Sequence, residues 1–335
     1  MRIPRFLVVR LLSIIPVLFG VTFLSFIVAR VMVPNPARAW AGLITDQSII
    51  NQLIVEYHLN APLYLQYFYY MGGILTGNWG VSPSTKLPVL FEIENYFPAT
   101  LELVIVASII SIILGTLFGI YAAVKHDTVQ DHLIRITYLS GIATPPFLAA
   151  LLASIIFTRF IPILPSGGEL SPGLIAPHIT GLVLLDSLIT GKFGIFANAL
   201  YHIILPAAVL AFLGFGIGAR VLRASMLESL NQDYVRTARS KGLDESKVVL
   251  KHAFRNSLTA ATTVLALSVS ALLGGTLVVE YIFSWPGIGS FAVNSILNYD
   301  FPSVIGTTLV YAIGVVVANL IADILYTYLD PRVRL

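Results

Sequence analysis

Long runs without a charged residue dominate this sequence. A helix needs about 20 apolar residues to cross the hydrocarbon core of a membrane, and a charged side chain at its centre costs about 2.5–3.5 kcal/mol. Only 11% of the 335 residues are charged, whereas a soluble domain has about a quarter. Six runs meet the length requirement: Leu11–Ala29, Leu103–Val124, Ile136–Thr158, Phe193–Ala219, Asn256–Val279 and Phe301–Ala322. The sequence therefore predicts an all-α, polytopic transmembrane helical bundle with six spans.

Two apolar segments have a second interpretation. Ser171–Leu185 is short and contains Pro172 and Pro177, so it is predicted to be an external loop. The first run could be a secretory signal, but the apolar core of such a signal is about 7–15 residues long. Leu11–Ala29 has 19 residues without a charge, which favours a retained span.

Basic residues are distributed unevenly around the six runs. If the N-terminus is cytoplasmic, 15 of the 20 Lys and Arg residues fall in cytoplasmic segments. The five on the other side are Arg30, Arg38, Lys86, Arg159 and Lys192. The positive-inside rule therefore predicts a multi-pass protein of the cell (cytoplasmic or inner) membrane, surrounded by lipid, with both termini cytoplasmic. This bias accounts for the net charge of +3 without a nucleic-acid partner.

The spans divide the chain into four regions. These are an N-terminal span (1–32), an external region (33–97), a five-span core (98–329) with a cytoplasmic loop at 220–257, and a cytoplasmic tail (330–335).

The aromatic residues of Tyr64–Tyr70 favour a membrane-interface belt over a ligand-contacting surface. Phe160–Lys192 is rich in Pro and Gly, which predicts an irregular loop. Tyr281–Pro302 contains Trp285-Pro286-Gly287, cannot be one continuous helix, and is expected to dip back along the membrane surface.

The cytoplasmic loop has a helical pattern. Apolar side chains recur at four-residue intervals, at Leu222, Met226, Leu230, Tyr234 and Ala238. This spacing predicts a helix, which Gly242 ends because glycine adopts the left-handed conformation readily. Asp244 is expected to cap the next helix. A basic helix of this kind can lie among anionic lipid headgroups or dock on a cytoplasmic partner, and the pattern alone leaves both open.

The sequence lacks the residue patterns of catalytic and cofactor-binding sites. The sequence has no Gly-x-x-x-x-Gly-Lys-Ser/Thr phosphate loop, no cysteine, and six scattered histidines, so we expect neither an enzyme nor a cofactor or metal. The glycines of Gly115–Gly119 and Gly214–Gly218 have the small-residue spacing that lets membrane helices approach closely. Glu102, Glu280 and Asp323 lie near span ends. An ion-coupled carrier needs acidic residues near the membrane midplane, so the position of these three residues near span ends disfavours such a carrier. For each of them, packing at the membrane interface and contact with the substrate both stay open.

Several segments resemble the permeases of ABC importers. Asp233–Leu243 followed by Lys251–Asn256 resembles the signature cytoplasmic loop of that group, and more narrowly its dipeptide/oligopeptide B-type branch. Gly274–Gly289, which ends in Trp-Pro-Gly-Ile-Gly, is similar to the most characteristic segment of the branch. Pro98–Glu102 and Leu164–Gly167 also match. The resemblance covers nearly the whole chain and implies a type I ABC importer permease fold.

Three positions depart from the family pattern. Its Glu-Ala-Ala is Arg236-Thr237-Ala238 here, which is usual for the B-type branch. Its Pro-Gly-Asp-Pro is Pro34-Asn35-Pro36-Ala37, and its Gly-Asp-x-Gly is Gly77-Asn78-Trp79-Gly80. The last two each lack an acidic residue on the external face.

The resemblance also implies partners and sites. The partners are a second homologous permease subunit, two cytoplasmic ABC ATPase subunits that hydrolyse ATP, and an external substrate-binding protein. The expected ATPase-coupling residues are Tyr234, Arg236, Thr237, Ala238, Arg239, Lys241, Gly242 and Leu243. Ala238 would let the coupling helix sit close, and the basic residues would meet acidic or polar groups. The expected residues of an outer gate or translocation path are Glu102, Glu280, Trp285, Pro286 and Gly287.

The expected function is thus that of a permease subunit in an ATP-driven importer. A stand-alone channel or ion-coupled carrier and a membrane scaffold are the alternatives from other classes. The resemblance favours dipeptides or oligopeptides as substrate, because members of this family carry peptides. Oligosaccharides are the alternative, because Trp40, Trp79 and the aromatics of Tyr64–Tyr70 would suit stacking on sugar rings.

Overall fold

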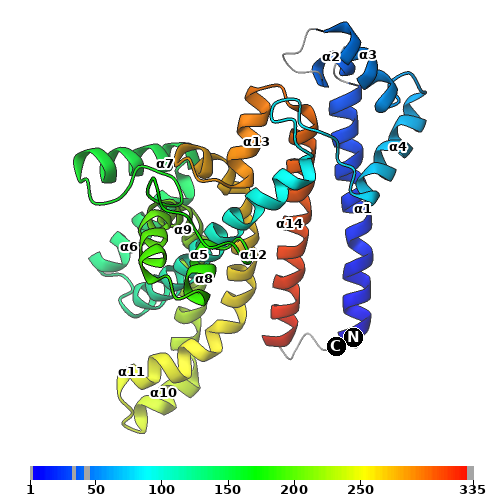
Figure 1. Cartoon of the computed structure of the whole chain (residues 1–335). Coiled ribbons are helices and arrows are strands. Elements are labelled where there is room, and N and C mark those ends of the chain that lie inside the picture. Colours follow the sequence, from blue (N-terminus) through cyan, green and yellow to red (C-terminus); the bar gives the residue numbers. More distant parts are fainter. Residues whose placement is uncertain (1–2, 32–34, 41–45, 330–335) are drawn as a thin grey trace.

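The computed structural model describes residues 3–31, 35–40 and 46–329, so the predicted tail at 330–335 lies outside the described residues. Those residues form a helical bundle (Figure 1), which confirms the all-α prediction. The helices are α1 (Ile3–Arg30), α2 (Pro36–Trp40), α3 (Gln47–Glu56), α4 (Leu63–Thr76), α5 (Val89–Val124), α6 (Val129–Ala143), α7 (Pro146–Ser154), α8 (Val183–Ile189), α9 (Phe193–Leu230), α10 (Asp233–Ser240), α11 (Glu245–Lys247), α12 (Arg255–Ile282), α13 (Ile288–Leu297) and α14 (Phe301–Leu329), with π-helical segments η1 (Ile155–Phe160) and η2 (Val248–Phe254).

Helix α9 is the centre of the bundle. It packs most extensively against α5, then against α12 and α6, while α14 packs on α12 and α1 lies outside α14 (Figure 1). Large side chains from α5, α9 and α12 fill the space between these three helices, among them Leu103, Ile203, Leu210 and Val279. These helices therefore share one core, and a force applied to any of them acts on the others.

The structure confirms a multi-pass membrane protein without fixing the number of spans. Among the described residues, three helices are long and apolar enough to cross a membrane: Val89–Val124, Phe193–Leu230 and Phe301–Ile324. The helices α1 and α12 carry shorter apolar stretches, Leu12–Val28 and Ser270–Ile282. The count of six spans stays a prediction.

The predicted third span, Ile136–Thr158, is not one straight helix. Helices α6 and α7–η1 meet at 111° across a short break. Thr144 is extended there, with ψ of 127°, because the helical region is disfavoured for a residue before proline. The two prolines that follow, Pro145 and Pro146, then begin α7. An apolar run shows that a segment is buried in lipid or protein, but it does not show that the segment is straight.

Helix α5 begins earlier than the apolar run that predicted it. It starts at Val89, inside the segment expected to be external, and continues through Pro98. Val89 and Ile93 are buried against Ile288 and Phe291 of α13. The polar residues of these first turns excluded them from the predicted span. Tertiary packing against α13 nevertheless stabilises them as helix.

The four-residue apolar pattern of the cytoplasmic loop spans two helices rather than one. Helix α9 ends at Leu230, and α10 begins at Asp233 after Gln232 adopts an extended conformation with ψ of 152°. The single-helix prediction is wrong at this break. Because the turn folds α10 back, the buried positions of both helices still meet in one cluster.

The segment Phe160–Lys192, predicted to be an irregular loop, is irregular up to α8, a short helix at Val183–Ile189 that the prediction missed. His202 of α9 fixes it: its Nδ1 lies 3.2 Å from the carbonyl oxygen of Gly167, and its Nε2 lies 3.1 Å from Ser171 Oγ. Asn198 accepts a hydrogen bond from the backbone N–H of Ser171 at 2.9 Å. The loop is thus held on the end of α9.

The aromatic cluster of Tyr64–Tyr70 lies on α4 and divides between two environments. Tyr67 packs edge-on against Phe26 of α1, with ring centroids 5.3 Å apart, and Tyr70 lines a cavity beside α14. Tyr64, Phe68 and Tyr69 are exposed. The cluster therefore has both side chains that pack inside the subunit and side chains that face outward, and the choice between a membrane-interface belt and a ligand-contacting surface stays open.

Small residues set the distance between α5 and α9. A Cβ atom placed on Gly119 of α5 would lie 2.9 Å from the Cβ of Leu222 and 3.1 Å from the carbonyl oxygen of Ala219. A Cβ on Gly214 would lie 2.6 Å from Leu272 Cδ2 of α12. The predicted role of these glycines in close helix packing is confirmed.

Replacing Gly119 with Val should lower stability by about 1–3 kcal/mol, because the added carbons overpack a fitted contact. The measurement is thermal unfolding of the purified protein in detergent. Gly20→Val in α1 is the matched control, since nothing lies within 4 Å of a Cβ there. Equal unfolding temperatures for the two variants would contradict the packing argument.

Candidate functional site

Helix α10 is attached to the bundle by two buried side chains. Val235 is 0% exposed and Ala238 is 5% exposed. They pack in a cluster that draws residues from α5, α9, η2 and the loop itself: Ala123, Leu222, Met226, Val248, Val249 and Ala253. This cluster, which we call the cytoplasmic core, joins α10 rigidly to the spanning helices.

The other side of α10 and the turn after it face outward. The exposed residues include seven of those expected to couple to an ATPase: Tyr234, Arg236, Thr237, Arg239, Lys241, Gly242 and Leu243. Ala238, the eighth, lies on the inner side. Its small side chain lets α10 sit close to the cytoplasmic core, which places it beneath the exposed face rather than on it.

The turn after α10 depends on Gly242. Its φ of +73° lies in the left-handed region. The backbone N–H of Gly242 donates to the carbonyl of Arg239 at 2.9 Å, and that of Leu243 donates to the carbonyl of Ala238 at 3.5 Å. This pair of bonds is the Schellman ending of a helix. Nothing lies within 4 Å of a Cβ at Gly242, so glycine is needed here for its backbone conformation and not for space.

Polar contacts fix the helical turn that follows. Arg239 donates to both carboxylate oxygens of Glu245, at 2.6 and 3.1 Å, and this guanidinium holds the pKa of Glu245 below its usual range. Asn256 at the start of α12 donates to the Tyr234 hydroxyl at 3.1 Å. Asp244 stands at the predicted cap position, but its side chain makes no capping bond and instead pairs with Lys247 at 3.2 Å.

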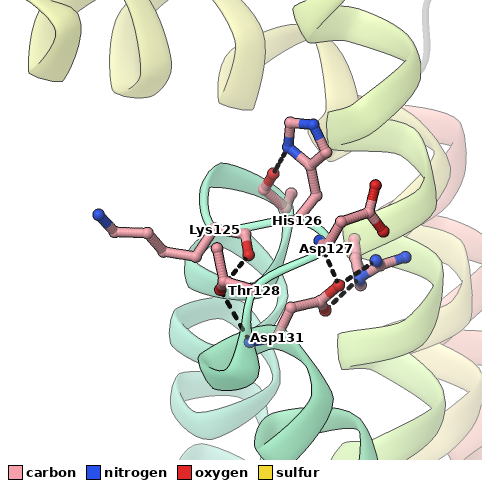
Figure 2. Close-up of polar contacts among 7 residues, drawn as sticks. Lys125, His126, Asp127, Thr128 and Asp131 are labelled. Atoms are coloured by element: carbon pink, nitrogen blue, oxygen red, sulfur yellow. Dashed lines mark hydrogen bonds and ion pairs between the residues drawn. The ribbon is translucent and has the colours of Figure 1, made fainter.

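A buried ion pair joins α6 to α9. The side chain of Asp131 in α6 is 0% exposed. Its carboxylate accepts hydrogen bonds from Nε of Arg223 in α9 at 2.8 Å, from Nη2 at 2.5 Å, and from the backbone N–H of Asp127 at 3.2 Å (Figure 2). Thr128 caps α6 by accepting from the N–H of Asp131 at 3.4 Å. The turn between α5 and α6 is thereby tied to α9.

Sequence reasoning missed this pair, although a signal was present. Thr128 and Asp131 have the three-residue spacing of a capping box. Arg223 was counted only as one more cytoplasmic charge. Asp131 and Arg223 are 92 positions apart in the sequence. Whether they meet depends on how α6 crosses α9, and the spacing of residues along the chain does not reveal this crossing.

Asp131→Asn should destabilise the protein by about 3 kcal/mol, because it leaves the Arg223 guanidinium without its counter-charge. Glu245→Gln is the control: it also removes a carboxylate bonded to an arginine, but in an exposed pair, where the loss should stay below about 1 kcal/mol. Thermal unfolding of both variants is the measurement. A similar loss in the two would mean that burial of the Asp131 pair contributes nothing extra.

At the opposite end of the bundle, Glu280 organises the turn between α12 and α13. It is fully buried and accepts from the backbone N–H groups of Gly289 at 2.7 Å and Ser290 at 3.3 Å. A carboxylate at a helix N-terminus is favourable because it satisfies unpaired N–H groups and meets the positive end of the helix dipole. Here it caps α13.

The same turn is bonded to α5. The indole N–H of Trp285 donates to the carbonyl of Ala99 at 2.9 Å, and the N–H of Ile288 donates to the Thr100 hydroxyl at 2.8 Å. Trp285 and Gly287 are buried and Pro286 is partly buried. The expected break in the helix is thus confirmed as a tight turn between α12 and α13 inside the subunit, while the dip of Tyr281–Pro302 along the membrane surface stays a prediction.

Glu102 lies apart from this turn. Its side chain accepts a hydrogen bond from the backbone N–H of Leu184, in the first turn of α8, at 2.8 Å. Glu169 in the external loop is a carboxyl that sequence reasoning did not single out, and burial followed by the charge of Glu102 raises the pKa of Glu169 to about 7. The structure thus brings Glu280, Trp285, Pro286 and Gly287 together, while Glu102 belongs to a neighbouring carboxyl pair. Among the described residues no group of three His, Cys, Asp or Glu could hold a metal.

Comparison with known proteins assigns the chain to a family. Residues 115–335 match the family described as binding-protein-dependent transport system inner membrane component, and residues 3–104 match its N-terminal companion. The chain is 41% identical to the probable D,D-dipeptide transport system permease protein of Escherichia coli over 322 residues, which is 96% of this chain and 95% of the relative.

Two other relatives are similarly complete. The dipeptide transport system permease protein of Alkalihalophilus pseudofirmus is 38% identical over 97% of this chain and 98% of its own length. The oligopeptide transport system permease protein of Bacillus subtilis is 36% identical over 98% and 99%.

The chain belongs to the family of binding-protein-dependent transport system inner membrane components. It is a multi-pass inner-membrane permease subunit of an ABC importer, with the type I importer permease fold. It is a transport subunit rather than an enzyme, and the names of its relatives do not favour the oligosaccharide alternative.

Proposed function

We propose that this chain and a second, homologous permease form the path by which short peptides enter the cell, driven by two cytoplasmic ATPase subunits. The peptide specificity rests on the relatives, which are named as dipeptide, D,D-dipeptide and oligopeptide permeases. An external binding protein would deliver the peptide. The observation that carries the drive mechanism is the exposed face of α10 held on the buried cytoplasmic core.

The arrangement of the ends supports this orientation. The first turns of α1, the last turns of α14 and helix α10 point toward one end of the molecule, while α2, α3 and α13 lie toward the other (Figure 1). The end with α10 carries the excess of basic residues that the positive-inside rule assigns to the cytoplasm. Both termini would therefore be cytoplasmic, and the binding protein would dock on the end formed by α2, α3 and α13.

The coupling mechanism follows from how α10 is attached. Binding of ATP would bring the ATPases together and move α10, which sits in a cleft on one of them. Because Val235 and Ala238 join α10 to α5, α9 and η2, α10 cannot move alone. A packed core shifts as a unit between discrete arrangements, so the movement would tilt the bundle and switch access from outside to inside.

The exposed residues would have different tasks. Tyr234, Thr237 and Leu243 present contact surface, while Arg236 and Lys241 present charge to acidic or polar groups. Arg239 is already engaged with Glu245, so its main task would be to hold the turn in shape.

The outer gate would move as one piece. Trp285 and Gly287 lie in a turn that is bonded to α5, and Glu280 at the end of α12 caps α13. Tilting α5 and α12 would carry this turn along, and Glu102 with its external loop would follow. These residues would therefore shape the outer mouth by setting the position of α13 instead of by touching the peptide.

Gly242→Val should uncouple ATP hydrolysis from uptake while leaving the protein inserted. A β-branched residue in the left-handed region costs about 1–2 kcal/mol, so the turn after α10 should open and displace Leu243. The measurement is uptake per ATP hydrolysed in proteoliposomes, with an expected loss of at least tenfold.

Gly242→Asn is the matched control, because asparagine tolerates the left-handed region better than other non-glycine residues. It should keep most of the coupled uptake. Unchanged uptake in Gly242→Val, or an equal loss in both variants, would contradict the coupling role of this turn.

The peptide specificity is tested with the external binding protein that accompanies this permease. Calorimetric titration with short peptides and with oligosaccharides should show tight binding of peptides. Uptake by the reconstituted importer should then be stimulated by the same peptides. Binding of sugars alone would move the system to oligosaccharide import and make Trp40 and Trp79 candidates for substrate contact.

A further inference from the structure

Arg30, at the outer end of α1, is a buried cation with an unusual environment. Only 7% of the surface of Arg30 is exposed. Nη1 donates both of its hydrogen bonds, to the carbonyl of Tyr57 and to Oε1 of Gln66, each at 3.1 Å. The guanidinium carbon lies 4.3 Å from the centre of the Trp40 ring. The group is therefore held in one place by neutral acceptors and an aromatic face.

No carboxylate pairs with Arg30 anywhere in residues 3–31, 35–40 and 46–329. Burying a charge without a counter-charge is strongly unfavourable. The Nε atom also lacks an acceptor. The Nε–Nη2 edge of a guanidinium is a side on which it takes an oxyanion through two parallel hydrogen bonds, and here the Nε of that edge has no partner.

Other unpaired polar groups surround the same place. Trp40 Nε1 and the Tyr70 hydroxyl are buried without a hydrogen-bond partner in the described structure. Together with Arg30 they line a cavity of about 290 Å³ between α1, α2, α4 and α14. Three unsatisfied groups that are able to donate, around one cavity, indicate an anionic occupant with several acceptor oxygens.

The acidic group nearest the cavity is at its rim. Glu56 of α3 lines the opening but is exposed, so water screens its charge. The inner wall is apolar and is formed by Ile305 and Leu309 of α14. The cavity therefore offers a polar, cationic side and an apolar side.

Its surroundings identify the source of the anion. The cavity lies at the outer ends of α1 and α14, beside surfaces that suit the lipid of the outer leaflet. Phe23 and Leu24 of α1 and Phe68 and Leu75 of α4 expose from 44% to 81% of their area. A group that reaches the cavity along these side chains carries acyl chains with it.

We propose that this cavity binds the phosphate group of an anionic phospholipid from the outer leaflet. The phosphate oxygens would accept from the Nε–Nη2 edge of Arg30 and from Trp40 Nε1. The first carbons of the lipid would lie against Ile305 and Leu309. Because the lipid bridges α1, α2, α4 and α14, it would fasten the external helices to the bundle.

The test uses the importer complex purified through a tag on this chain and reconstituted in nanodiscs of phosphatidylcholine with phosphatidylglycerol. Native mass spectrometry counts the phosphatidylglycerol retained after removal from the nanodisc. Arg30→Gln should reduce the retained fraction at least tenfold. Arg38→Gln is the matched control, because Arg38 is a nearby exposed arginine outside the cavity lining, and it should leave retention unchanged.

A second measurement keeps the proposal testable if Arg30→Gln fails to fold. The wild-type complex should unfold at a higher temperature in nanodiscs with phosphatidylglycerol than in phosphatidylcholine alone, and Arg30→Lys should shrink that difference, since lysine keeps the charge but lacks the two-point edge. Equal retention in Arg30→Gln and wild type, or no difference between the lipids, would overturn the proposal. Stabilisation by inorganic phosphate in phosphatidylcholine nanodiscs, equal to that by phosphatidylglycerol, would overturn the lipid as the source of the anion.

Discussion

The close packing of α5 and α12 on α9 is the constraint on which the rest of this structure depends. Lipid gives apolar helices little reason to associate, so their association depends on close contact at small residues. Gly119 and Gly214 allow this contact on two sides of α9. Because α9 extends from His202, which holds the loop after η1, to Arg223, which pairs with Asp131 of α6, one helix connects both ends of the bundle.

Much of this arrangement could be predicted from the sequence, and the failures have a common cause. Charge-free runs located the long helices, and Gly242 located the turn after α10, since both depend on local properties. The 111° bend at Thr144 and the break before Asp233 were missed. In both places the hydrophobic pattern continues across the break, because it records which side chains are buried and not the path of the backbone.

The candidate sites show the same limit. The exposed residues of α10 could be named from their motif, but the inward position of Ala238 depends on the cytoplasmic core. Glu280 stood out as an acidic residue near a span end, where packing and substrate contact were both open. The structure shows that its carboxylate caps α13, which requires a chain reversal that composition alone does not reveal.

Three of the buried ionisable side chains among the described residues have three different kinds of compensation. Asp131 is neutralised by Arg223, and Glu280 is stabilised by the N–H groups of α13. Arg30 has only neutral acceptors and one aromatic face. The first two have their compensation inside the chain and so hold elements of the bundle together. For Arg30 the balance is incomplete within the described chain, and this is why we propose that a phospholipid in the cavity beside it supplies the counter-charge.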